Sequence, residues 1–175
     1  MTEQPDGIDT TPQGYHTVTP WIIARDSAAL LDFITHAFGG TEIARVPNED
    51  GSIGHAEIRI GDSVVMMFDR RPDWPDLPAF LRLYVEDGNA VFARAIAAGA
   101  EPVTQMTELA WGDRVGRVRD PQGNVWWIQH RIAEFGPDEI AQRMAEPRFI
   151  EAMRYVQQAD IVPATSTRTP PQPAR

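Results

Sequence analysis

Cysteine and lysine are both absent from the sequence, and each absence excludes a class of chemistry. Without cysteine the chain forms no disulfide, no thiolate metal site and no cysteine nucleophile, and a reducing compartment is the simplest expectation. Without lysine it has no amine for a Schiff base and no lysine to hold a phosphate. All 16 basic residues are therefore arginine.

Long apolar runs are missing as well. The opening residues, MTEQPDGIDTTPQG, lack the basic stretch and apolar run of a signal peptide, and no apolar segment is long enough to cross a bilayer. We therefore expect a cytoplasmic protein without membrane contact. A formal net charge of -9 repels the phosphates of nucleic acids and mildly attracts cationic ligands, so nucleic acid is not an expected partner.

The length of 175 residues suits one domain with a sizeable core. Residues 1–14 and 161–175 are polar and contain proline, which predicts a flexible N-terminal tail and a disordered C-terminal tail. Between the tails we expect one domain over residues 15–131. It is made of two modules, at residues 15–70 and 78–131.

A helical extension is expected over residues 132–160. Pro137 suits the first turn of a helix, and Pro147 predicts a break before a second helical piece. The apolar side chains of this extension are expected either to pack on their own domain or to contact a second copy of the chain.

One order of elements, strand-helix-strand-strand-strand, occurs in both modules. Strands are predicted by short runs rich in β-branched and aromatic residues, and helices by apolar residues that recur on one helical face. The expected strands are residues 17–24, 41–46, 54–60, 63–69, 79–86, 101–107, 112–120 and 124–130, and the expected helices are residues 26–40 and 88–100. The repeat predicts an α+β fold of two tandem βαβββ modules.

A family resemblance rests on the order and spacing of four segments: TPWIIARDSAALLDFITHAFGG, GSIGHAEIRIGDSVVMMFD, LRLYVEDGNAVFARAIAAGAEPV and DRVGRVRDPQGNVWWIQHR. Together they resemble the vicinal oxygen chelate superfamily of glyoxalases, bleomycin-resistance proteins and dioxygenases, and are most similar to its PhnB-like, glyoxalase-like branch. The resemblance implies a curved mixed sheet around a cup, with the helices on the convex side. It also implies that one first-half and one second-half module line each cup, and that the chain forms a homodimer.

Strand alternation, aligned on the family pattern, separates the side chains that face the cup from those under the helices. Those expected to face the cup are Thr19, Trp21, His55, Glu57, Arg59, Met66 and Phe68 in the first module and Phe80, Arg82, Tyr84, Arg117, Trp127 and Gln129 in the second. Aromatic walls with a few convergent polar groups are typical of a small-molecule pocket. The alternative is that the aromatic side chains fill the cup and leave no cavity, and a register error of one residue would invert any of these assignments.

The resemblance also bears on metal binding. In metal-dependent relatives, four strand positions supply His, Gln or Glu ligands, and the matching positions here are Thr19, Met66, Phe80 and Trp127. These side chains offer weak donors or none, so we expect no metal cofactor. An atypical site that begins at His55 and Glu57 is the alternative, and a hydrogen-bonded couple with Arg59 as partner is the simpler interpretation of that pair.

Two functions follow from these expectations. The first is a metal-free protein that binds a small planar or cationic molecule, similar to the drug-sequestering bleomycin-resistance members. The alternative is a metal-independent enzyme, such as a lyase or isomerase, in which His55 carries a proton, Glu57 orients it, and Arg59 or Arg82 binds a carboxylate or enolate. A metal-dependent glyoxalase or dioxygenase with unusual ligands, and a purely structural or partner-binding module, remain further alternatives.

Overall fold

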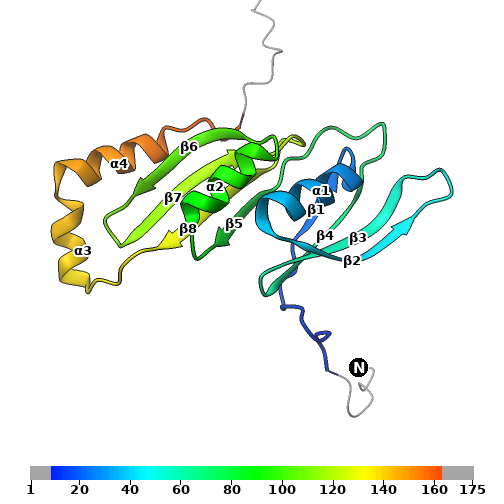
Figure 1. Ribbon diagram of the computed structural model, residues 1–175, viewed down its shortest axis with the longest axis horizontal. Coiled ribbons are helices and arrows are strands. Elements are labelled where there is room, and N and C mark those ends of the chain that lie inside the picture. The colour runs from blue at the N-terminus through cyan, green and yellow to red at the C-terminus, as the bar shows by residue number, and fades with distance from the viewer. Residues whose placement is uncertain (1–8, 163–175) are drawn as a thin grey trace, which may run out of the picture.

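The computed structural model describes residues 9–162, in which two modules of the same topology lie side by side (Figure 1). The first module contains β1 (Trp21–Ala24), α1 (Ser27–Phe38), β2 (Thr41–Pro47), β3 (Ile53–Ile60) and β4 (Ser63–Asp69). The second contains β5 (Phe80–Tyr84), α2 (Gly88–Ala97), β6 (Glu101–Glu108), β7 (Asp113–Arg119) and β8 (Val125–Arg131). The predicted α+β fold of two βαβββ modules is thus confirmed. The tail residues 1–8 and 163–175 lie outside the described part of the chain.

Each module forms its own mixed sheet of four strands. The strand orders are β1-β4-β3-β2 and β5-β8-β7-β6, and the first two strands of each order run parallel while the others are antiparallel. Helix α1 begins at an aspartate cap, Asp26, and ends at Gly39, whose φ of 70° is a conformation that glycine adopts at little cost. Asp87 caps α2 in the same way as Asp26 caps α1.

Strand β1 begins later than the sequence predicts. It was expected from Thr17, but the first residue in the sheet is Trp21. Pro20 has no N–H for a strand ladder, and the hydroxyl of Thr19 donates to the carbonyl of His16 at 2.9 Å in a local turn. Residues 17–20 therefore belong to the segment that leads into the strand.

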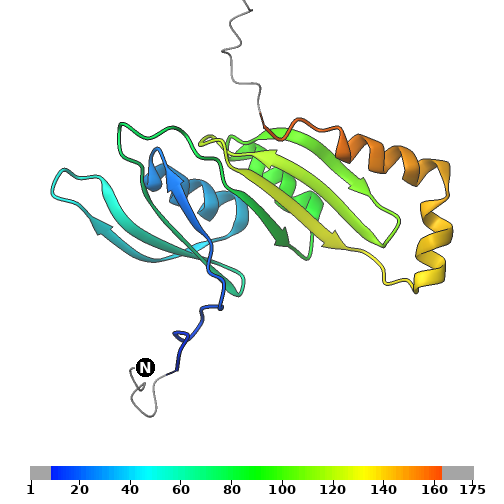
Figure 2. The ribbon, with the colours of Figure 1, turned by 180° about the vertical axis from the view of Figure 1, so that it is seen from behind.

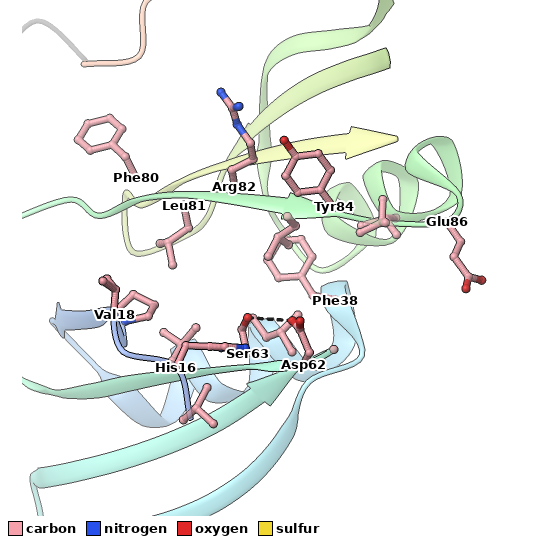
Figure 3. Close-up of a pocket in the computed structure, with 18 of the residues that line it drawn as sticks. His16, Val18, Phe38, Asp62, Ser63, Phe80, Leu81, Arg82, Tyr84 and Glu86 are labelled. Carbon is pink, nitrogen blue, oxygen red and sulfur yellow. Dashed lines mark hydrogen bonds between the residues drawn. The ribbon is translucent and has the colours of Figure 1, made fainter. Parts of the chain in front are cut away.

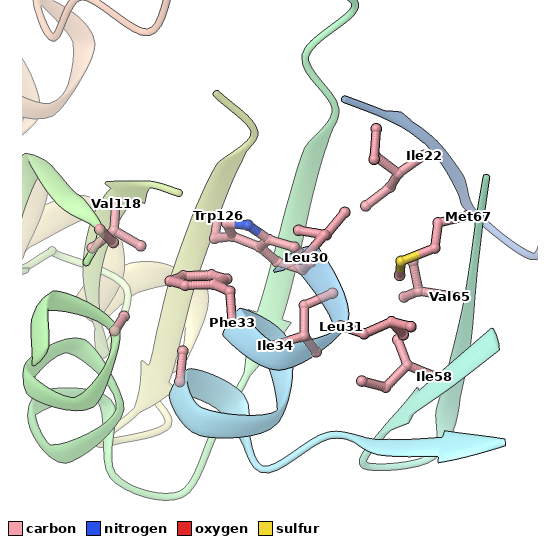
Figure 4. Close-up of a cluster of buried hydrophobic side chains, with 14 of the residues drawn as sticks. Ile22, Leu30, Leu31, Phe33, Ile34, Ile58, Val65, Met67, Val118 and Trp126 are labelled. Carbon is pink, nitrogen blue, oxygen red and sulfur yellow. The ribbon is translucent and has the colours of Figure 1, made fainter. Parts of the chain in front are cut away.

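The structure confirms which side chains of the strands were predicted to lie under the helices. Buried residues on that side of the first sheet include Ile22, Ala56, Ile58, Val65 and Met67. They pack against the apolar face of α1, as the labelled side chains in Figure 4 show. Because side chains alternate along a strand, the intervening residues are directed to the helix-free side of the sheet.

The two modules share one hydrophobic core. Trp126 of β8 is fully buried in it, and its ring lies 4.8 Å, centroid to centroid, from that of Phe38 at the end of α1. Arg94 of α2 also donates to the carbonyl of Ala37, at 3.3 Å. The helices α1 and α2 lie together on one side of the molecule, and from behind the helix-free faces of both sheets are seen (Figure 2).

The C-terminal extension forms two helices, α3 (Pro137–Met144) and α4 (Pro147–Gln157), separated at the predicted proline. Phe149 and Val156 of α4 are buried, and Val156 packs with Leu109 and Val115 of the second module. The extension therefore packs on its own domain through these residues, whereas Met144 and Ile150 are exposed. No helix in the described part of the chain is long and apolar enough to span a membrane.

Candidate functional site

The structure brings the predicted cup residues together as two groups on two separate sheets. Within residues 9–162, no strand ladder joins the sheets, so each module offers its own helix-free face. The first face carries Trp21, His55, Glu57, Arg59, Met66 and Phe68, with Thr19 just before the strand, and the second face carries Phe80, Arg82, Tyr84, Arg117, Trp127 and Gln129. In the described part of a single chain, each face therefore belongs to its own sheet of four strands.

The first face holds a hydrogen-bonded chain of three side chains. The Tyr15 hydroxyl donates to one carboxylate oxygen of Glu57, and His55 Nε2 lies 2.9 Å from the other. The expected partnership of Arg59 with this pair is wrong, because Arg59 donates to the carbonyl of Gly14 at 3.1 Å and Tyr15 takes its place. Tyr15 comes from the segment before β1, which crosses this face.

These hydrogen bonds fix the ionisation of Glu57. The bond from Tyr15, and to a smaller extent the bond and charge of His55, hold the pKa of Glu57 below its ordinary value although burial opposes them. The same bond raises the pKa of the Tyr15 hydroxyl. Glu57 is therefore an anionic acceptor that orients His55, whose side chain is partly exposed.

Aromatic residues cover the neighbouring part of the first face. The rings of Trp21 and Phe68 stack with centroids 5.4 Å apart, and Trp74 meets Phe68 edge-on at 6.4 Å. Trp21 nevertheless remains 58% exposed. The first face is thus an open, aromatic surface beside the hydrogen-bonded side chains of Tyr15, His55 and Glu57.

The second face is organised around Trp127 on the central strand β8. Strand register places Arg82 of β5 and Arg117 of β7 directly beside it, on opposite sides. The guanidinium carbons lie 4.1 Å and 3.9 Å from the centre of the indole ring, respectively. Both contacts are within the range of cation–π attraction.

A cavity of about 310 Å³ lies over this row of residues. Its walls are Phe80, Leu81, Arg82, Arg117, Val125 and Trp127 of the sheet and Val156, Gln157, Ala159 and Ile161 of the C-terminal segment. The segment is held there by Arg117, which donates to the carbonyl of Val156, and by Arg119, which donates to the carbonyls of Asp160 and Ile161 at 3.2 and 3.4 Å. The end of α4 and the residues after it therefore cover one side of the cavity.

Gln129 is held beside this row by an acidic neighbour. The buried carboxylate of Asp113 accepts from the Gln129 amide and, at 2.8 Å, from the indole N–H of Trp111. Trp111 is therefore tied to the sheet beside α4. In the described part of the chain, the buried Nε1 of Trp127 and Oε1 of Gln129 have no hydrogen-bond partner.

A larger cleft of about 850 Å³ separates the first module from β5 (Figure 3). Leu81 points into it towards Val18, whereas Arg82 points away towards the helix-free face. At its floor, the Ser63 hydroxyl bonds the carboxylate of Asp62 at 2.9 Å. Its lining is of mixed charge, with Asp62, Glu86 and Arg94 among apolar residues, whereas the charged side chains of the smaller cavity are all arginine.

The chain matches the sequence profile of a known protein family. Residues 14–128 match the sequence profile of the Glyoxalase/Bleomycin resistance protein/Dioxygenase superfamily. The chain belongs to this superfamily. Both βαβββ modules lie largely within the matched region, whereas α3 and α4 lie outside it.

The chain also has a sequence relative and structural neighbours. A Mycobacterium bovis protein described as uncharacterized is 35% identical over 139 residues, which cover 73% of this chain and 91% of that protein. The crystal structure of TioX from Micromonospora sp. ML1 covers 69% of this chain and 100% of its own, with 24% identity and a TM-score of 0.56. TnmS3, an antibiotic binding protein from Streptomyces sp. CB03234, covers 71% and 98%, with 21% identity and a TM-score of 0.53. The likeness to the two solved structures shows the fold.

Metal-dependent members of the superfamily need several nitrogen or oxygen ligands that converge on one ion. Here Met66 and Thr19 line one cavity on the first module, whereas Phe80 and Trp127 belong to the second sheet. Within residues 9–162, no three acidic or imidazole side chains come together as a metal site. The side chains of Thr19, Met66, Phe80 and Trp127 therefore do not offer the ligands that a divalent metal ion needs.

Sequence reasoning missed three contributors to the two faces. Tyr15 carries no periodic signal because it precedes the strand, and the cover formed by Val156 and Ile161 comes from a distant segment. Asp113 had a usable signal, because it lies two and four residues before Val115 and Arg117 and so shares their side of β7.

Proposed function

We propose that the chain binds a small molecule with a planar apolar part in the cavity over Trp127, without a metal ion. The observation that supports this most is the position of that cavity between an aromatic sheet face and the C-terminal segment. Its volume of about 310 Å³ lies at the lower end of the range of small-molecule pockets. The ligand is therefore expected to contain one or two fused rings rather than a large macrocycle.

The biological role that we propose is ligand capture rather than turnover. TnmS3, which shares the fold, is described as an antibiotic binding protein. A binding protein needs only the pocket, whereas an enzyme also needs reactive groups that converge in it. The proposed assignment to the PhnB-like branch is compatible with this role.

Isothermal titration against a panel of planar natural products and antibiotics tests the proposal. Trp127→Ala removes the floor of the cavity and is expected to weaken binding of any hit by about tenfold or more, the scale of a lost aromatic contact. Trp21→Ala removes an aromatic ring from the other face and serves as the matched control. Equal binding by the wild type and the Trp127→Ala protein would contradict the proposal.

We also propose that a second copy covers the exposed apolar residues beside the cleft. Phe80 is 55% exposed, Tyr84 is 65% exposed, and both line that cleft together with the exposed Val18. Exposed aromatic side chains are enriched in protein interfaces. Multi-angle light scattering is expected to give twice the mass of 19.5 kDa, and Tyr84→Glu is expected to shift it towards the monomer. A wild-type protein that stays monomeric at high concentration would contradict this part.

Metal-independent catalysis on the first face is the second candidate function. The 2.9 Å contact between Glu57 and His55 favours it, because an oriented imidazole can carry a proton near neutral pH. If a lyase or isomerase activity is found, His55→Gln is expected to abolish most of it, and His36→Gln, on helix α1, is expected to leave it intact. Activity that survives His55→Gln would remove this candidate.

A further inference from the structure

We infer that the cavity over Trp127 takes an anionic ligand, the carboxylate of a small aromatic acid, bound by Arg82 and Arg117. This inference rests on the proposed binding function and names its ligand class. It differs from the cationic ligand expected from the net charge of -9. That charge is a sum over the whole chain, whereas a ligand in the cavity meets the charges that line it.

The lining of the cavity contains two positive charges and no negative one. Arg82 and Arg117 are its only ionisable side chains in the described part of the chain. Across residues 9–162, neither guanidinium forms an ion pair with a carboxylate. Other arginines, such as Arg70 and Arg143, have carboxylate partners at 3.1 Å.

The burial of Arg117 makes the lack of a counter-ion significant. Its exposed fraction is 8%, and its hydrogen bond goes to a neutral carbonyl, that of Val156. Burial, and then the neighbouring charge of Arg82, lower the pKa of Arg117. A buried charge normally has an ionic partner, because transfer of an unpaired ion out of water is unfavourable. A ligand carboxylate would supply the missing partner for both groups.

The chemistry of the walls selects a carboxylate with an apolar body. Guanidinium groups donate two parallel hydrogen bonds to a carboxylate, which gives charge-assisted bonds in a fixed geometry. The rest of the cavity is mostly apolar, with Phe80, Val125, Val156 and Ile161 among its walls. An inorganic anion would leave these walls without contacts, whereas a ring attached to the carboxylate would fill them.

Three probes of nearly equal shape test the charge requirement. They are 2-naphthoate, its neutral amide and the cationic 2-naphthylmethylammonium, each titrated calorimetrically into the full chain at pH 7. We expect the acid to bind at least about tenfold more tightly than the amide, the scale of a hydrogen bond to a charged group, and the cation more weakly still. Equal affinity for acid and amide would overturn the inference while leaving the proposed pocket intact. If none of the three probes binds, both the inference and the proposed function fail.

Two substitutions locate the charge. Arg117→Gln and Arg82→Gln are each expected to weaken 2-naphthoate binding by about ten- to hundredfold and to change amide binding by less than about threefold. Arg82 is exposed, so its variant remains informative if Arg117→Gln does not fold. Arg131→Gln is the matched control, because Arg131 lies on the same strand as Trp127 but outside the cavity lining. Naphthoate affinity that is unchanged in Arg82→Gln, or that falls equally in Arg131→Gln, would overturn the inference.

Discussion

Replacement of Asp120 by alanine is expected to destabilise the second module more than any surface change of equal size. Asp120 lies in the turn between β7 and β8 and is buried. Its Oδ1 accepts from the backbone N–H groups of Gln122 and Asn124 at 2.8 and 2.9 Å. Its Oδ2 accepts from the Asn124 amide at 2.8 Å and from the indole N–H of Trp126 at 2.9 Å. Asn124 in turn accepts from Ala79 N at 2.9 Å, so the network fixes the start of β5 beside β8.

The magnitude follows from the donors that the substitution leaves without a partner. Asn124 and Trp126 are both buried, so water does not readily replace the lost acceptor. Three buried donors lose their acceptor, and each costs about 1 to 3 kcal/mol, which gives about 3 to 9 kcal/mol for the network. A typical domain has a free energy of unfolding of about 5 to 15 kcal/mol, so the variant is expected to be close to its limit of stability.

Urea denaturation at 25 °C, followed by tryptophan fluorescence, measures this loss as a fall in the free energy of unfolding. Asp26→Ala is the matched control, because Asp26 caps α1 with a single hydrogen bond at an exposed site. Its expected cost is about 1 kcal/mol. The reasoning is refuted if Asp120→Ala costs no more than Asp26→Ala.

Two other substitutions test the remaining polar and apolar contacts. Because hydrogen bonds hold the pKa of Glu57 below its ordinary value, its ionised form stabilises the fold at pH values above that ordinary value, and the contribution is lost as the pH falls through the lowered pKa. Glu57→Gln is therefore expected to lose less stability than the wild type when the pH is lowered. The measurement is the denaturation midpoint of each protein at a series of pH values from neutral to acid. A midpoint that falls as steeply with pH in Glu57→Gln as in the wild type would contradict this. Phe149→Ala is expected to cost about 3 to 5 kcal/mol, since the buried ring anchors α4, whereas the exposed Ile150→Ala should cost little. Similar unfolding free energies for these two variants would show that α4 is not anchored through Phe149.

Local patterns in the sequence were sufficient for the fold of each module. Alternation along β1 and β3 correctly assigned Ile22, Ala56 and Ile58 to the core, because one side of each strand is covered by a helix. Pro137 and Pro147 correctly marked the starts of α3 and α4. The start of β1 was wrong because β-propensity from Thr17 onwards does not reveal the local turn that Thr19 makes.

The sequence predicted which residues lie on the face that carries the site, but not how their side chains are arranged in space. Alternation placed Arg82, Arg117 and Trp127 on the helix-free side, and the structure confirms that they share it. Their alignment in one row depends on the register of three strands that are distant in the chain, which no local pattern encodes. The contact of Arg117 with Val156 likewise depends on how α4 returns to the sheet.

The indole N–H resonances of the five tryptophans provide the most direct measurement of where a ligand binds. The protein is dialysed against a chelator, and its ¹⁵N–¹H spectrum is recorded during titration with 2-naphthoate, with each indole signal assigned by substitution. We expect the signal of Trp127 to shift most, because its side chain lines the cavity, while that of Trp126, which is fully buried and bonded to Asp120, changes little. A largest shift at Trp21, or binding that returns only when a divalent metal is added, would contradict a metal-free site on the second sheet.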